Sequence, residues 1–160
     1  MSLPFAYLDV PNAAALLAAG PGIADALILP ESVLDQPWAP GKAWTVGEMA
    51  WHLADVESAM LDRVRRVLAM DEPVLPSIPE DLWVRYLPRR PIATAAPWFT
   101  ANRTVLGDLV RNLPPGALAR RGAHPEFGAM TLADILRHLH GHALHHAAQL
   151  SPWRQSTPAC

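Results

Sequence analysis

The length and composition of this chain favour one folded domain and argue against a nucleic-acid-binding protein. Its 160 residues are 51% hydrophobic and 18% charged, so the chain can fill a core and does not have the composition of a disordered protein. Its formal net charge of -2 provides no basic field for a phosphate backbone, and nucleic acid is not an expected partner. We expect a single domain over residues 1–160, with a core from about 12 to 150 and a short tail over 151–160.

Cysteine usage and the short apolar runs indicate a cytoplasmic protein without a membrane anchor. The single Cys160 excludes an internal disulfide and fits a reducing compartment. Apolar runs such as "AAALLAAG" are too short to span a bilayer, and the start "MSLPFAYLDV" lacks the charged and apolar regions of an export signal.

Clusters of proline divide the chain into four helical segments, because proline blocks the interior of helices and strands. The first segment, residues 12–29, is rich in alanine and leucine but interrupted by "GPG", so it is one kinked helix or two short ones. The second runs from Thr45 to about Met70, and Thr45 and Glu48 form the pattern of a capping box. Its apolar residues recur at the three-and-four spacing of a packed helix: Val46, Met49, Leu53, Val56, Met60 and Val67.

The third segment, residues 92–113, ends at two consecutive prolines, and the fourth begins at Thr131 with a second capping pattern and runs to Leu150. No stretch alternates as a strand would, and no repeat of solenoid period is present. The sequence therefore predicts an all-α fold, a four-helix bundle.

The fourth helix carries histidines where its buried seam should be apolar. Counted as a heptad, the seam consists of Leu132, Ile135, Leu139, His142, His146 and Gln149. Burying an imidazole without a partner costs about 1 to 3 kcal/mol, so something must satisfy these rings. His142 and His146 lie four residues apart, which places both within reach of one metal ion, and a third ligand is available in His52 on the second helix.

Other histidine pairs, and structural roles, remain open from spacing alone. His138 with His142 is also an i, i+4 pair, His142 with His145 is an i, i+3 pair, and core histidines are often only hydrogen-bonded. His138 and His145 share a flank of the helix, where they are solvated or line the mouth of a cavity, and His140 points away from the seam. His124, in the turn "AHPEFG", is expected to have a structural role.

Two segments carry a resemblance to a known family. "PGKAWTVGEMAWHLADVE" and "HPEFGAMTLADILRHLHGHALHHAAQL" resemble the DinB/YfiT-like family, and the similarity extends over about residues 20–150. The resemblance implies a four-helix bundle, often a homodimer, in which three histidines hold a divalent metal; these fall on His52, His142 and His146. Some members carry a further histidine at the position of Gln149.

Three nitrogen ligands leave coordination positions for water or substrate, as in catalytic rather than structural metal sites. Zn, Ni, Co or Mn would suit such ligands. The site is expected to activate water for hydrolysis, or a low-molecular-weight thiol for transfer to a small-molecule substrate; the resemblance implies both classes, described as metal-dependent hydrolases and thiol-dependent S-transferases. The catalytic residues are not assigned.

Neighbouring polar residues offer supporting roles. Asp55 either orients a ligand or is solvated, and Arg103, which matches a common arginine of the family, either binds an anionic group of the substrate or forms a surface ion pair. Glu57 lies about 140° around the helix from His52, which is poor geometry for a general base. Two other functions remain open: a non-catalytic, stress-related metal-binding bundle that acts through a partner, and a metal-free dimerisation module whose histidines sense pH.

Overall fold

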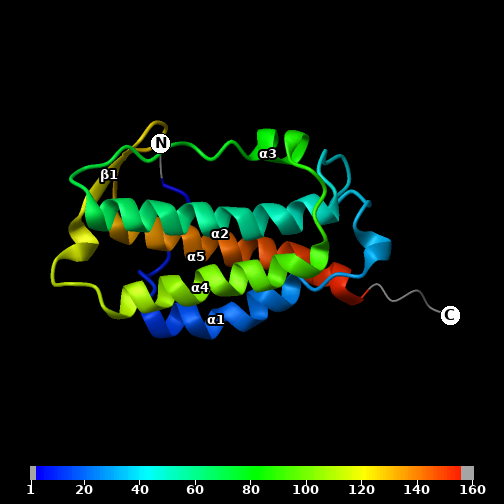
Figure 1. Ribbon diagram of the computed structural model, residues 1–160, viewed down its shortest axis with the longest axis horizontal. Coiled ribbons are helices and arrows are strands. Elements are labelled where there is room, and N and C mark those ends of the chain that lie inside the picture. The colour runs from blue at the N-terminus through cyan, green and yellow to red at the C-terminus, as the bar shows by residue number, and fades with distance from the viewer. Residues whose placement is uncertain (1–2, 156–160) are drawn as a thin grey trace.

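Four long helices lie lengthwise beside one another in the computed structural model, which describes residues 3–155 (Figure 1). They are α1 (Ala13–Ala26), α2 (Val46–Ala69), α4 (Ala95–Arg111) and α5 (Leu132–Leu150). The helix α1 packs against α4 and α5, and α2 packs against the same two helices. This arrangement confirms the predicted all-α, four-helix bundle.

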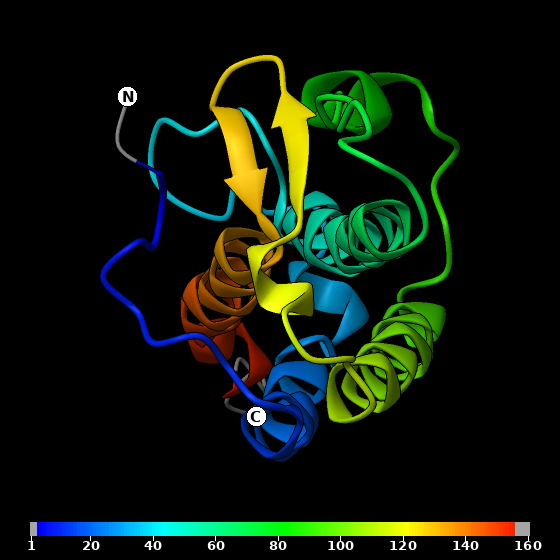
Figure 2. The ribbon, with the colours of Figure 1, turned by 90° about the vertical axis from the view of Figure 1, so that its left-hand side faces the viewer.

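Smaller elements cover one side of the bundle. Seen along the helix axes, a β-hairpin lies on the side of α2 and α5, whereas α1 and α4 form the opposite side (Figure 2). The short helix α3 (Glu80–Tyr86) follows the proline-rich segment after α2 and runs over the outer face of α2 (Figure 1). Short 3-10 turns connect the remaining segments: Glu31–Val33, Ile92–Thr94, Ala117–Ala119 and Ser151–Gln155.

The helix starts follow from the capping residues of the sequence. Asn12 accepts a hydrogen bond from the backbone N–H of Ala15 at 2.9 Å, and α1 continues through Pro21 as one helix, which decides between the two alternatives for this segment. Thr45 and Glu48 form a complete capping box at the start of α2. These local contacts satisfy backbone groups that a helix end leaves free.

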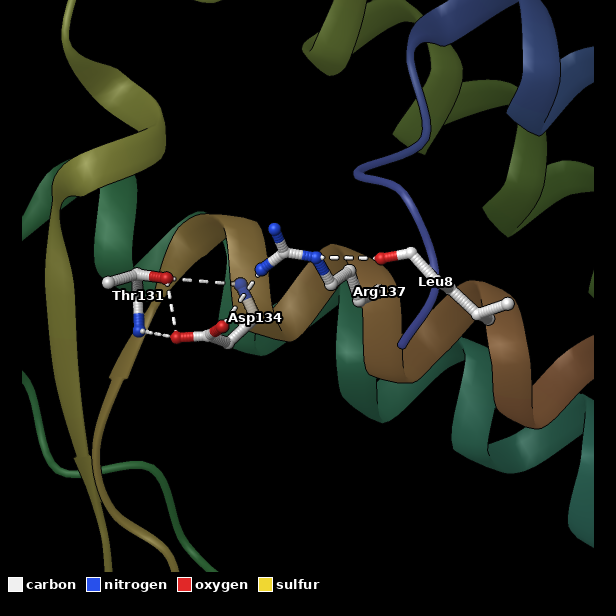
Figure 3. A network of polar contacts seen from close by, with 4 residues as sticks. All are labelled: Leu8, Thr131, Asp134 and Arg137. Carbon is white, nitrogen blue, oxygen red and sulfur yellow. Dashed lines mark hydrogen bonds and ion pairs between the residues drawn. The ribbon is translucent and has the colours of Figure 1, made fainter. Parts of the chain in front are cut away.

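A second capping box fixes the start of α5 and connects to the N-terminal segment (Figure 3). The side chains of Thr131 and Asp134 each bind the other residue's backbone N–H. Asp134 also binds Arg137, whose Nε donates to the carbonyl of Leu8 at 3.0 Å. The cap therefore holds both the histidine-bearing helix and the segment that crosses it.

The prediction that no strand is present was wrong. Strands β1 (Arg121–His124) and β2 (Gly128–Thr131) pair antiparallel, with Arg121 opposite Thr131. Each strand has only four residues, and one inward position of β1 is Gly122, so no hydrophobic alternation is visible. Leu75 fills the space beside this glycine, and a Cβ there would lie 2.8 Å from its Cγ.

Tertiary packing extends slightly beyond the expected core. Trp153, in the 3-10 turn after α5, packs against a hydrophobic cluster that includes Leu150. Cys160, on which the expected reducing compartment depends, lies outside the described residues. Among residues 3–155, no helix combines the length and hydrophobicity that crossing a membrane requires.

Candidate metal centre

Three histidines from two antiparallel helices, α2 and α5, lie close together. His52 Nε2 lies 3.0 Å from His142 Nε2 and 3.3 Å from His146 Nε2. His52 is buried, and the other two are half-buried. The structure thus brings together the seam pair and the lone histidine of α2, rather than the alternative pairs of His142 with His138 or His145.

The spacing of these nitrogens fits a single divalent ion. Zinc binds imidazole nitrogen at about 2.0 to 2.1 Å, so two ligands of a tetrahedral site lie about 3.3 Å apart. The observed separations of 3.0 and 3.3 Å are close to that value. In the part of the chain that the structure describes, no fourth histidine, cysteine or carboxylate joins this group. Three ligands would leave coordination positions for water or a substrate.

Burial keeps the three imidazoles uncharged. Burial, together with the nearby His146, lowers the pKa of His52 to about 3. Burial also lowers the pKa of His142 well below its usual value, helped by the surrounding histidines, and it lowers the pKa of His146. A neutral imidazole has a free lone pair on one nitrogen, which is the form that binds a metal.

Gln149 orients one of these rings. Its Oε1 accepts a hydrogen bond from His146 Nδ1 at 2.7 Å, which leaves the Nε2 lone pair of His146 directed into the cluster. The amide nitrogen of Gln149 lies 3.0 Å from His145 Nε2, so the ring of His145 is engaged outside the cluster.

An aromatic residue that the sequence reasoning missed covers the flank formed by His138 and His145. The ring of Phe5 lies 5.7 Å from the ring of His138 and 6.3 Å from that of His145. It occupies the space above Gly141, where a Cβ would lie 2.4 Å from Phe5 Cγ. The glycine in the middle of α5 was the available sign that something approaches this helix closely.

Arg103 takes neither role that the sequence suggested. It is 2% exposed and pairs with the equally buried Glu57, with 2.7 Å between Arg103 Nε and Glu57 Oε1. The ion pair joins α4 to α2 inside the bundle, because Arg103 faces the core and not the surface. Its guanidinium is therefore already engaged by a carboxylate and is not available to a substrate anion.

Asp55 does not join the histidine cluster. It binds Arg90 through two hydrogen bonds, and Arg90 stacks on Trp51 with its guanidinium carbon 3.7 Å from the ring centroid. These residues line a cavity of about 220 Å³ between α2 and α3, to which His52 and Trp83 also contribute. Asp55 thus belongs to this cavity and neither contacts a histidine of the cluster nor stands free in solvent.

Glu80 is the second residue that the sequence reasoning missed. It lies at the start of α3, and its Oε2 is 3.8 Å from Nδ1 of His52, on the side of the ring that faces away from the cluster. Burial, followed by the nearby Asp81, raises the pKa of Glu80. No periodicity reveals this residue, because it lies in the proline-rich segment between two long helices.

The remaining histidines lie outside the cluster. His124 is buried beside Arg63, and its Nδ1 accepts a hydrogen bond from the backbone N–H of Glu126, so its contacts are those of the structural role expected for this turn. His140 is half-buried on the side of α5 where Arg103 helps burial to lower its pKa.

Comparisons with known proteins agree with the fold and identify a family. The family model of the DinB superfamily matches residues 23–150. A protein of Oceanobacillus iheyensis, whose name assigns it provisionally to the metal-dependent hydrolases, is 27% identical over 119 residues, which cover 74% of this chain and 69% of the relative.

A solved structure shows a similar arrangement of helices. YfiT from Bacillus subtilis, described as a probable metal-dependent hydrolase with an unusual four-helix bundle topology, superposes with a TM-score of 0.77 at 22% identity. The match covers 86% of this chain and 81% of that one. With most of its length matched by the family model, this chain belongs to the DinB superfamily.

Proposed function

We propose that this protein is a metal-dependent enzyme that hydrolyses a small molecule, with His52, His142 and His146 as the ligands of one divalent transition metal. The observation that carries the proposal is the convergence of three neutral Nε2 atoms without a fourth protein ligand among the described residues. Structural zinc sites use four protein ligands, whereas catalytic sites use three and keep a position for water or substrate. The names of the two relatives support hydrolysis.

A divalent ion at this site would act as a Lewis acid and lower the pKa of a water molecule or a thiol. The chain's own residues would supply the binding geometry. Gln149 holds His146 with its Nε2 lone pair free, and burial keeps His52 neutral over the physiological pH range. Transfer of a low-molecular-weight thiol remains the second reaction to assay, because a thiolate is a good ligand for such an ion.

The metal content of purified variants tests this proposal. Protein made without a histidine tag is analysed by mass spectrometry for transition metals, beside His142→Ala and the matched control His140→Ala on the same helix. We expect about one metal per chain in the wild type and in the control, and none in His142→Ala, because two imidazoles bind an ion far more weakly than three. Retention of stoichiometric metal by His142→Ala would contradict the ligand assignment.

Activity assays then separate catalysis from a structural role. The same samples are tested with a chromogenic ester, and with a low-molecular-weight thiol plus an electrophilic acceptor. Metal and turnover should disappear together in His142→Ala. A non-catalytic metal-binding bundle would instead show a lower Tm after metal removal and no turnover of either substrate.

The pH-sensing alternative has less physical support. Burial lowers the pKa of His52 to about 3 and that of His138 to about 4, so these side chains would not change charge near neutral pH.

Dimerisation is proposed from the family resemblance, and light scattering on a size-exclusion column would test it.

A further inference from the structure

We infer that Glu80 is a positioning residue for the metal centre: its carboxylate accepts the Nδ1 proton of His52 and thereby directs the Nε2 lone pair of that ring toward the metal. This inference rests on the proposed function. It assigns to α3, a short helix in a proline-rich connection, a part in building the site.

The two nitrogens of His52 face opposite environments. Nε2 points into the cluster, 3.0 Å from His142 Nε2. A neutral imidazole carries one hydrogen, so Nε2 can ligate a metal only if that hydrogen is on Nδ1. Whatever accepts the Nδ1 hydrogen therefore determines whether His52 is in the ligating tautomer.

Glu80 is placed to be this acceptor. Its Oε2 lies 3.8 Å from Nδ1, and among residues 3–155 the structure gives Nδ1 no hydrogen bond to another group. A hydrogen bond would require the carboxylate to approach by about 1 Å. The cavity between α2 and α3 contacts both Glu80 and His52, and the Glu80 side chain is 41% exposed, so neighbouring atoms leave room for this movement.

The other charged side chains of the cavity are already engaged. Arg90 pairs with Asp55, and Arg89 pairs with Asp35 at 3.0 Å. Glu48 belongs to the capping box of α2. Of the acids and bases that line the cavity, Glu80 alone has no fixed partner and faces the ring of a proposed ligand.

The same site contains one such arrangement already formed. Gln149 Oε1 accepts the Nδ1 hydrogen of His146 at 2.7 Å and leaves Nε2 of that ring for the cluster. Partners of this kind fix the orientation of metal-binding histidines, and their loss typically weakens metal affinity about 10- to 100-fold. Glu80 would do for His52 on α2 what Gln149 does for His146 on α5.

A simpler role for Glu80 is that of an acid at the start of a helix. Glu80 and Asp81 both lie in the first turn of α3, where negative charge stabilises the helix end. Asp81→Asn therefore serves as the matched control, because it removes the same charge from the neighbouring position without changing the acceptor that faces His52.

The test measures affinity for Co²⁺ by competition with a chelator in the wild-type protein, Glu80→Ala, Glu80→Gln and Asp81→Asn. We expect Glu80→Ala to bind Co²⁺ about 10- to 100-fold more weakly. Glu80→Gln should recover part of the affinity, because an amide oxygen also accepts a hydrogen bond, and Asp81→Asn should match the wild type. The ¹⁵N spectrum of the metal-free protein provides a second readout, in which Glu80→Ala should reduce the fraction of His52 with its hydrogen on Nδ1.

The outcomes distinguish this inference from the proposed function. A wild-type protein that binds no Co²⁺ would contradict the three-histidine centre and, with it, the role of Glu80. Wild-type binding with unchanged affinity and an unchanged His52 tautomer in Glu80→Ala would contradict the role of Glu80 alone. An equal loss of affinity in Asp81→Asn would show that general charge near α3 is responsible, and would also overturn the inference.

Discussion

Polar side chains inside this bundle differ in how they are satisfied. The clustered histidines are kept neutral by burial and converge on a common point, whereas Arg103 and Glu57 neutralise each other as an ion pair between α4 and α2. Burial raises the pKa of Glu57 to about 7, with Arg103 opposing that rise. The Nη1 nitrogen of Arg103 has no hydrogen-bond partner among the described residues. Because both side chains are buried, removing either member of the Arg103–Glu57 pair should reduce the stability of the fold.

Removal of one partner should therefore be strongly destabilising. Arg103→Met is expected to lower the free energy of unfolding by about 3 to 5 kcal/mol, because it leaves Glu57 buried without its counterion. The double variant Arg103→Met with Glu57→Leu should regain a large part of this loss. Urea unfolding of the single and double variants measures the coupling.

An exposed ion pair provides the comparison for this experiment. Arg111 binds Asp108 on the same helix, with its side chain 56% exposed, so Arg111→Met should cost at most about 1 kcal/mol. An equal cost for the two single variants would show that burial of the Arg103 pair has no special energetic weight.

Helix α5 begins with a capping box and has a glycine in its interior. Its capping box fixes the first turn, and Figure 3 shows this cap beside the hydrogen bond from Arg137 to Leu8. In the middle of the helix, the ring of Phe5 from the N-terminal segment packs directly against Gly141. Glycine in a helix interior costs about 1 kcal/mol relative to alanine. The close approach of Phe5 is the physical reason that a smaller residue is required at this position.

The effect of Gly141→Ala should therefore depend on Phe5. In the wild-type background a Cβ would meet Phe5 Cγ at 2.4 Å, so the substitution should displace the ring and lower stability. In a Phe5→Ala background the same substitution should stabilise the protein by about 1 kcal/mol, because alanine is the better helix former. Thermal or urea unfolding of the four combinations measures the change of sign, and the same effect in both backgrounds would contradict the packing argument.

Protonation links these local features to the stability of the whole molecule. Burial raises the pKa of two carboxyls, Glu57 and Glu80. It lowers the pKa of six of the seven histidines: His52, His124, His138, His140, His142 and His146. Above pH 6.5 an imidazole is mainly neutral in both the folded and the unfolded chain. Below this pH the unfolded chain takes up protons that the buried rings exclude. The raised pKa values of Glu57 and Glu80 have the opposite effect and favour the folded state as the pH falls. These two carboxyls are fewer than the six histidines, so the histidines determine the net effect.

The metal-free protein should consequently lose stability as the pH falls from 7 to 5. His52 alone, with a folded pKa of about 3, should contribute about 1.4 kcal/mol per pH unit once the pH is well below 6.5. Urea unfolding in the presence of a chelator at both pH values tests this expectation, and His52→Gln should show a weaker pH dependence. Equal or greater stability at pH 5 than at pH 7 would contradict the expected loss of stability at low pH.

Much of the fold was predictable because its causes are local in sequence. The capping residues marked the starts of α2 and α5, and the apolar spacing of α2 identified residues such as Val46, Leu53 and Met60 that are fully buried. The hairpin was missed because four-residue strands with an inward glycine have no clear alternation. The helix α3 was missed because prolines surround it.

The sequence by itself determined four helices, their order, and a histidine pair at i, i+4 on the seam of α5, because helical periodicity and capping depend on near neighbours. It also indicated His52 as the third member, and the structure places all three Nε2 atoms together; their ligation of a metal stays a prediction. Only the tertiary structure decided that Arg103 is buried against Glu57, that Phe5 covers Gly141 and that Glu80 faces His52. Each of these contacts joins segments far apart in the chain, and their approach depends on how the helices pack rather than on spacing within one helix.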